Sequence, residues 1–312
     1  MSWELLLALV ALLAFVVQLL YFLRADGDLT LLWAEWQGRR PEQELTNKVI
    51  WVTGASSGIG EELAYQLSKL DVSLVLSARR VHELERVKRK CLENGNLKGK
   101  DILVLPLDLK DTSSHEAATK AVVKEFGKID ILVNNSGRSH CSWCLETSMD
   151  IYRELIELNY LGTISLTKCV LPHMVKRKQG KIITVTSILG HVSMPVSSAY
   201  CASKHALRIL GHNGDQYRQM VTSRCVWLIL ISMANDLKEV WIAEQPFLLM
   251  LYLCQYMPTW SSWVINKVGK RIENFNNSVG SRTIAALSFV IIFVLVQILY
   301  TDDFRIWKTK RD

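Results

Sequence analysis

A glycine-rich turn between an apolar run and an amphipathic segment restricts this chain more than any other feature. Residues 49–60 read Val-Ile-Trp-Val-Thr-Gly-Ala-Ser-Ser-Gly-Ile-Gly, and the segment Glu61–Leu70 follows at once. This order predicts a buried strand, a tight turn and a helix start. Glycines let backbone N–H groups approach a pyrophosphate, and a helix N-terminus adds partial positive charge. Simple chain reversal is the alternative to a nucleotide site at Gly54, Ser56, Ser57, Gly58, Ile59 and Gly60.

From Asn47 onward, strand and helix patterns alternate, which favours an α/β fold with a doubly wound, Rossmann-like parallel sheet. The expected strand order is 3-2-1-4-5. The five strands are expected at Lys48–Thr53, Ser73–Ser77, Ile102–Pro106, Ile129–Asn134 and Gly180–Ser187. The longest helix is expected at Ile151–Lys176, and a later helix and last strand at Thr222–Asp236 and Lys238–Glu244.

The N-terminal stretch Leu5–Leu23 is apolar apart from Gln18 and is long enough to cross a bilayer as a helix. A cleaved signal peptide fits less well, because Glu4 stands where basic residues are expected and no Ala-x-Ala site follows. We therefore predict an uncleaved membrane anchor.

The C-terminal part carries two more apolar stretches. Pro246–Met257 suits a membrane-facing or substrate-entry lid, or an ordinary packed helix. Ile284–Tyr300 predicts a second membrane segment before the basic run Arg305–Arg311. The charge cues for orientation disagree. The arginines after the first segment favour a cytosolic domain, whereas a second span would send Arg305–Arg311 to the lumen.

Composition excludes two classes of function. The net charge is +7, but the basic residues are scattered, so nucleic acid is not an expected partner. Of the seven cysteines, Cys141 and Cys144 have the spacing of half a zinc site. No second pair exists to complete it, so no metal site is predicted.

Residues after three other predicted strands suit a dinucleotide. Arg79 and Arg80 follow the second strand, where arginine accommodates a 2′-phosphate and an acidic residue would select NAD. Asp108 follows the third strand and Asn134 closes the fourth. Each has an ordinary alternative. The arginines could be solvated side chains at a helix start, Asp108 could cap a helix before Thr112, and Asn134 could belong to a plain turn.

Three residues form a set suited to carbonyl chemistry. Ser187 ends the fifth strand, Tyr200 follows it, and Lys204 lies one helical turn beyond Tyr200, on the same helix face. A tyrosine of ordinary pKa, about 10, is a poor acid–base catalyst near neutrality. A lysine cation beside it favours the phenolate, and the serine can hold a carbonyl or alkoxide oxygen. Each residue alone has an ordinary structural explanation.

Together with the turn Thr53-Gly-x-x-x-Gly-x-Gly60 and Asn134-Asn-Ser-Gly137, these residues resemble the membrane-anchored short-chain dehydrogenases/reductases. The resemblance implies Tyr200 as acid and base, Ser187 as stabiliser of the substrate oxygen, and Lys204 as ribose binder and modifier of the tyrosine pKa. It also implies that Asp108 lies beside the adenine and that Asn159 orders a proton-relay water.

The chain departs from the family after Lys204. A sixth strand and a Pro-Gly loop are expected there, yet the chain passes directly to His212–Gln216 and contains no Pro-Gly dipeptide. The missing segment would leave the nicotinamide side open and shorten the usual helix interface between subunits. We expect Gly211–Gln216 to act as a shortened connector and Lys238–Glu244 to pair with the fifth strand.

These observations predict an NADP(H)-dependent oxidoreductase, of the class that interconverts carbonyl and alcohol groups. Its substrate would be a lipophilic molecule such as a steroid, retinoid or xenobiotic, and its location the endoplasmic reticulum membrane. The alternative is a non-catalytic, membrane-bound nucleotide-binding remnant. The predicted divisions are an anchor at 1–24, a connector at 25–46, the core at 47–211, the rest of the domain at 212–280 and a membrane segment with a basic tail at 281–312.

Overall fold

Strand β1 (Val49–Thr53) lies inside a sheet, and all of its residues are buried. The computed structural model describes residues 3–190, 197–208, 222–243, 245, 247–257, 260 and 294–300. Five parallel strands follow the order β3-β2-β1-β4-β5, as predicted. The other four are β2 (Ser73–Ser77), β3 (Ile102–Val104), β4 (Ile131–Asn134) and β5 (Lys181–Thr186).

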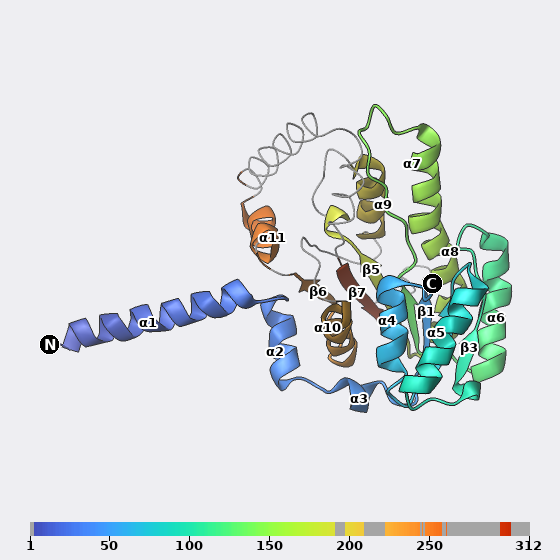
Figure 1. Cartoon of the computed structure of the whole chain (residues 1–312), viewed down its shortest axis with the longest axis horizontal. Coiled ribbons are helices and arrows are strands. Elements are labelled where there is room, and N and C mark those ends of the chain that lie inside the picture. Colours follow the sequence, from blue (N-terminus) through green and yellow to red (C-terminus); the bar gives the residue numbers. More distant parts are fainter. Residues whose placement is uncertain are drawn as a thin grey trace, which may run out of the picture.

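Helices cover both faces of this sheet (Figure 1). Because side chains alternate along a strand, Ile50 and Val52 of β1 point to one face while Val49 and Trp51 point to the other. The first face packs against α4 (Gly58–Leu67), α5 (Val81–Asn94) and α10 (Thr222–Ala234). The second packs against α6 (His115–Phe126) and α8 (Gly162–Arg177).

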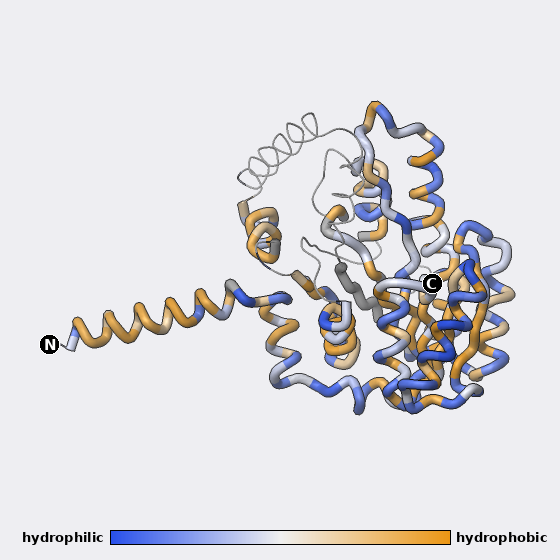
Figure 2. The backbone as a smooth tube through the Cα atoms, viewed as in Figure 1, coloured by the Kyte–Doolittle hydropathy of each residue, from blue (hydrophilic) through white to orange (hydrophobic). Residues whose placement is uncertain are grey.

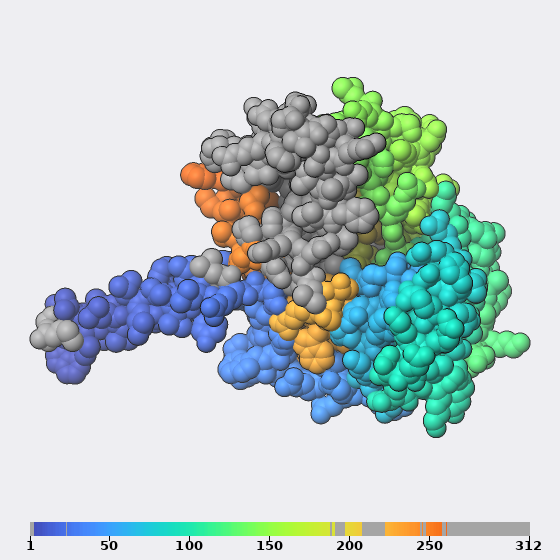
Figure 3. Space-filling model, in the orientation of Figure 1, coloured from blue at the N-terminus to red at the C-terminus, as the bar shows by residue number. Residues whose placement is uncertain are grey.

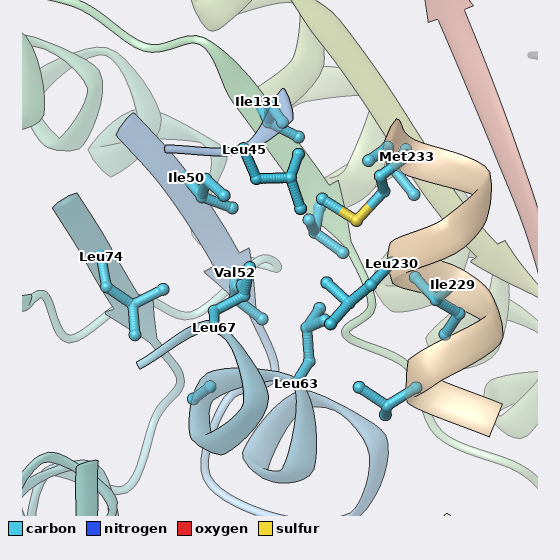
Figure 4. Close-up of a cluster of buried hydrophobic side chains, with 14 of the residues drawn as sticks. Leu45, Ile50, Val52, Leu63, Leu67, Leu74, Ile131, Ile229, Leu230 and Met233 are labelled. Atoms are coloured by element: carbon cyan, nitrogen blue, oxygen red, sulfur yellow. The ribbon is translucent and has the colours of Figure 1, made fainter. Parts of the chain in front are cut away.

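Figure 4 shows the first of these two cores. Val52 of β1, Leu63 and Leu67 of α4 and Leu230 and Met233 of α10 all belong to this cluster. All five side chains are fully buried. The predicted late helix therefore exists and completes the core beside β1.

The predicted long helix is present in three consecutive parts. These are α7 (Met149–Leu155), a π-helical turn η3 (Ile156–Leu161) and α8. Asn159 lies in the π turn. Such turns are rare and often occur at functional sites, because the wider turn redirects a side chain. Helix α9 (Ser198–Arg208) packs against η3, and α11 (Phe247–Tyr256) follows strand β6 (Glu239–Ile242).

The C-terminal membrane prediction is wrong for Val294–Tyr300. These residues form strand β7, which lies between β5 and β6 and runs antiparallel to both. An apolar run of this kind suits a sheet as well as a bilayer, and the open edge of β5 provides backbone partners. The rest of the predicted span, 284–293, lies outside the described residues.

The expected pairing of Lys238–Glu244 with β5 is also wrong, because β7 occupies the edge of β5. Its strand β6 forms, but β7 separates it from β5. The predicted connector Gly211–Gln216 lies outside the described residues.

Helix α1 (Trp3–Arg24) projects from the domain (Figure 1), and Figure 2 shows it as almost uniformly hydrophobic. Its residues Trp3–Phe22 have a mean hydropathy of 2.7 and are long and apolar enough to cross a membrane. The next segment packs on the domain as α2 (Leu29–Gln37) and α3 (Pro41–Glu44). Arg224 of α10 holds it by donating to Asp26 and Glu35, each at 2.7 Å.

Asp130 joins the starting ends of three strands. Its carboxylate accepts hydrogen bonds from Val49 N–H at 2.9 Å and from Arg177 at 3.0 Å, and Lys128 lies 2.8 Å away. Its backbone carbonyl accepts from Lys181 N–H of β5. Burial raises the pKa of Asp130, but the bonds from Lys128 and Val49 and the Arg177 charge outweigh it, so the pKa lies below its ordinary value.

Replacing Asp130 by Asn should reduce the free energy of unfolding by about 1–3 kcal/mol at neutral pH, because charged bonds are lost. A carboxyl with a lowered pKa stabilises above its unfolded pKa, about 3.9, and this contribution disappears as pH falls through the folded value. The difference between wild type and Asp130→Asn should therefore shrink below about pH 4. Urea unfolding in detergent at several pH values measures it.

The control is Asp150→Asn, since the Asp150 side chain is 89% exposed and paired only on the surface with Arg153. If both variants lost the same free energy of unfolding at every pH, the role assigned to Asp130 would be contradicted.

Candidate functional site

A cavity of about 340 Å³ lies at the carboxyl ends of the first four strands. In open parallel sheets, ligands bind at this edge, where the strand order reverses between β1 and β4. The lining comes from the loop after each strand and from Leu158 of η3. These loop residues are Gly54, Ser56, Ser57 and Ile59; Ala78, Arg79 and Arg80; Leu107, Asp108 and Leu109; and Asn135, Ser136 and Gly137.

The glycine turn brings backbone close to this cavity. Gly54 has φ +67°, and a Cβ there would lie 2.9 Å from the Cα of Ser136. A Cβ at Gly60 would lie 2.4 Å from the Gly54 oxygen. Both positions therefore require glycine. Gly58 opens helix α4 (φ +60°), and Gly58 and Gly60 set the turn without lining the cavity.

Thr53 and Asn135 join the loops after β1 and β4. The Asn135 amide donates to the backbone oxygens of Thr53 at 3.0 Å and Gly54 at 3.3 Å. The Thr53 hydroxyl accepts from the N–H of Asn135 at 3.0 Å and of Ser136 at 3.2 Å, and donates to Val133. These bonds fix against each other two of the loops that line the cavity.

Asn134 is placed differently from its neighbour. Its side chain is buried and donates to Thr167 of α8 at 3.0 Å, so it does not line the cavity. Among the described residues, the side-chain oxygen Oδ1 of Asn134 has no hydrogen-bond partner. Strand alternation was the signal that could have separated the two asparagines, because Asn134 shares its sheet face with Leu132.

The arginines after β2 lie at the mouth of the cavity and are exposed. Arg80 donates to the hydroxyls of Ser56 at 3.2 Å and Ser57 at 3.4 Å, so its guanidinium lies over the glycine turn. Asp108 lines the cavity and accepts from Lys110 N–H at 3.1 Å. It does not cap the turn at Thr112, where Asp111 stands instead.

The predicted catalytic residues come together after β5. Ser187 is buried and hydrogen-bonded to Tyr200, and it also accepts from Leu189 N–H at 3.3 Å. The Lys204 ammonium lies 5.8 Å from the centre of the Tyr200 ring and donates to the Val185 carbonyl at 3.2 Å. Both Tyr200 and Lys204 lie on α9, one turn apart.

Asn159 joins this set to the cavity. Its amide donates to Ser203 of α9 at 2.9 Å and to the Arg138 carbonyl at 3.0 Å, and it accepts from Arg138 N–H at 2.9 Å. A Cβ at Gly137, which lines the cavity, would lie 3.4 Å from Asn159 Oδ1 and 3.5 Å from Lys204 Nζ. Sequence reasoning missed Ser203 and Arg138, since neither stands in a motif.

Burial controls the acid–base groups. It raises the pKa of Tyr200 to about 12, although the hydrogen bond with Ser187 lowers it in part. It also lowers the pKa of Lys204 to about 8. The pKa of Tyr200 is therefore raised and not lowered as predicted, because desolvation is the largest cause and the group that opposes it is Ser187, not Lys204. At neutral pH, Tyr200 is a protonated phenol and Lys204 is mostly a cation.

Known proteins resemble this chain in sequence. The family model "short chain dehydrogenase" matches residues 48–220. Dehydrogenase/reductase SDR family member 7 of Homo sapiens is 63% identical over 357 positions, covering all of both chains. The same-named protein of Mus musculus is 64% identical, covering 89% of this chain and 96% of its own. The human alignment exceeds the 312 residues of this chain, so some of its positions have no counterpart here.

Solved structures agree in fold. A metagenomic short-chain oxidoreductase in complex with NADP has a TM-score of 0.55 and 26% identity, covering 62% of this chain and 92% of its own. A short-chain dehydrogenase/reductase from Burkholderia phymatum in complex with NAD has a TM-score of 0.50 and 25% identity, covering 55% of this chain and 65% of its own. The matched family model and the relatives that align over the whole chain show that this protein belongs to the short-chain dehydrogenase/reductase family of oxidoreductases.

Proposed function

We propose that this protein binds NADP(H) in the cavity and interconverts a carbonyl group and an alcohol on a lipophilic small molecule. Steroids, retinoids and xenobiotic ketones are the candidate substrates. The observation that carries the proposal is the position of Gly137 in the cavity wall, where an added Cβ would lie within 3.5 Å of both Asn159 and Lys204. This position joins the cavity to the Ser187–Tyr200–Lys204 set.

The residues present fit a dinucleotide. Gly54 and Gly137 place no side chain in the cavity at their own positions, and the N-terminus of α4 supplies backbone donors for a pyrophosphate. Arg79 and Arg80 supply positive charge at the mouth, next to the turn hydroxyls. Arginine there accommodates a 2′-phosphate, which supports NADP(H) over NAD(H).

The bound nicotinamide supplies or accepts a hydride. In reduction, the Tyr200 phenol donates its proton to the carbonyl oxygen, while Ser187 holds that oxygen. The Lys204 cation stabilises the phenolate that Tyr200 then carries. In oxidation, the same groups act in reverse. The contacts of Asn159 with Arg138 and Ser203 favour a positioning role alongside the water-ordering role that family membership implies.

The apolar helix α1 supports a membrane location, and we propose the endoplasmic reticulum. A substrate that partitions into lipid would reach an anchored enzyme at high local concentration.

A non-catalytic nucleotide-binding remnant is the second candidate. It is favoured by the departure after Lys204 and by the human alignment, which is longer than this chain. Calorimetric titration of the detergent-solubilised protein with NADPH, paired with a carbonyl-reduction assay, separates the two. Binding with turnover supports the enzyme, and binding without turnover supports the remnant.

NADPH should bind at least about tenfold more tightly than NADH, which corresponds to about 1.4 kcal/mol from charge-assisted phosphate contacts. Arg80→Ala should remove most of this preference and leave NADH affinity nearly unchanged. The matched control is Arg89→Ala, an exposed arginine further along α5 that does not line the cavity. Equal affinities for the two cofactors in the wild-type protein would contradict the 2′-phosphate assignment.

Tyr200→Phe should lower kcat for carbonyl reduction by about 100-fold or more, because the transferable proton is lost while the ring still packs. NADPH affinity should stay within about twofold of wild type. Tyr65→Phe is the control, since that hydroxyl bonds to Glu61 outside the cavity. Turnover undiminished in Tyr200→Phe would exclude the acid–base role.

Reduction should slow on the alkaline side with a midpoint near pH 8. Burial lowers the pKa of Lys204 to about 8, so its charge is lost there, whereas Tyr200, with its pKa raised to about 12, keeps its proton. In Lys204→Arg the guanidinium stays charged, so the fall should move above about pH 10. A profile of kcat/KM for NADPH against pH tests this in both proteins, because kcat/KM reports the groups of the free enzyme, and a wild-type profile that is flat through pH 9 would contradict it.

A further inference from the structure

The outer face of α2 carries large apolar side chains. Leu29, Trp33 and Trp36 stand at i, i+4 and i+7 and are 67%, 61% and 68% exposed. The two indoles contact each other edge to face, with centroids 5.3 Å apart. On the opposite face, Leu31 and Ala34 are buried in the core. The acidic residue of α2, Glu35, is turned to Arg224, so the outer face carries no charge.

This face lies close to the end of the membrane helix. Candidate span Trp3–Phe22 ends a few residues before Leu29, and the chain between them can reach at most about 25 Å. The junction is also held in place. Gln245 donates to the Phe22 carbonyl at 2.9 Å, Ala25 is buried, and Asp28 caps α2 and accepts from Trp241 N–H. Helix α2 therefore cannot lie far from the surface of a bilayer that α1 crosses.

Helix α11 extends the same side of the domain. Figure 1 places α2 and α11 where α1 leaves the domain, and Figure 3 shows the three on one side. Leu249, Tyr256, Met257 and Trp260 are at least 40% exposed. The inner residues Leu248 and Leu251 pack with Ala25.

Lipid is the occupant that this composition fits. Tryptophan and tyrosine prefer the membrane–water interface, since an apolar ring meets a polar edge there. Exposed Arg24 and Arg40 lie at the end of α1 and just before α3, where they suit anionic headgroups.

We propose that the outer faces of α2 and α11 lie in the headgroup–acyl boundary of the bilayer that α1 crosses. The domain then contacts the bilayer surface directly and is not connected to it by α1 alone. Tyr200 packs against the cluster that contains Ala25, Leu248 and Leu251, so the reactive tyrosine lies behind the lipid-contacting layer. The proposal rests on the membrane anchor of the proposed function and goes beyond it.

Photocrosslinking of the full chain in phosphatidylcholine vesicles that contain an alkyne-tagged lipid tests this. p-Benzoylphenylalanine replaces Trp33 or Trp36 in separate variants. The matched control replaces Val175, which is 42% exposed on α8, far from α1 in Figure 1. A positive control replaces Leu12, 59% exposed on α1. Lipid adducts at positions 33 and 36 should exceed those at 175 by about tenfold, because an interfacial helix buries its apolar face among headgroups and acyl chains.

The other outcomes overturn the proposal in distinguishable ways. Adducts at 12 with none above the Val175 level at 33 and 36 would retain the anchor and reject the lipid contact of α2. Crosslinked dimers at 33 or 36 in place of lipid adducts would assign the face to a second copy of the chain. Absence of adducts at 12 would reject the anchor itself, while NADPH binding, measured on the same samples, tests the proposed chemistry separately.

Discussion

The hydrogen bonds between Thr53 and the Asn135 loop are the interaction on which the site depends. They tie the end of β1 to the end of β4, the two strands between which the sheet order reverses. Gly54 and Gly137 then both line one cavity. A side chain at either glycine would meet the other loop or the catalytic groups, so the same approach that closes the fold also makes room for a cofactor.

Burial sets the protonation of the two groups proposed for catalysis, Lys204 and Tyr200. Lys204 is 4% exposed and donates to the neutral Val185 carbonyl. Its charged form is therefore disfavoured, because it lies out of water beside an uncharged acceptor. Tyr200 is likewise kept protonated. Binding of a phosphate-bearing cofactor near such groups adds negative charge, which favours the lysine cation. Near neutral pH the Tyr200 phenol therefore keeps its proton, as the proposed reduction requires.

The N-terminal and C-terminal segments complete the domain from outside its five-strand core. Arg224 pairs with Asp26 and Glu35, and Asp28 accepts from β6, so the residues after α1 belong to the folded body. Strand β7 covers the edge of β5 from the other end of the chain. Both additions satisfy groups that the core alone would leave open.

The sequence by itself determined the parallel core, its strand order and the Ser187–Tyr200–Lys204 set, because alternating periodicity and short glycine and helix motifs depend on neighbours in the chain. Tertiary structure decided the rest. It buried the Asn134 amide against Thr167 and left Asn135 beside the cavity, because the packing of α8 on one face of the sheet decides what the Asn134 side chain meets. It also made Val294–Tyr300 a strand. Apolar composition alone suits a sheet and a bilayer equally, and only the open edge of β5 distinguishes them.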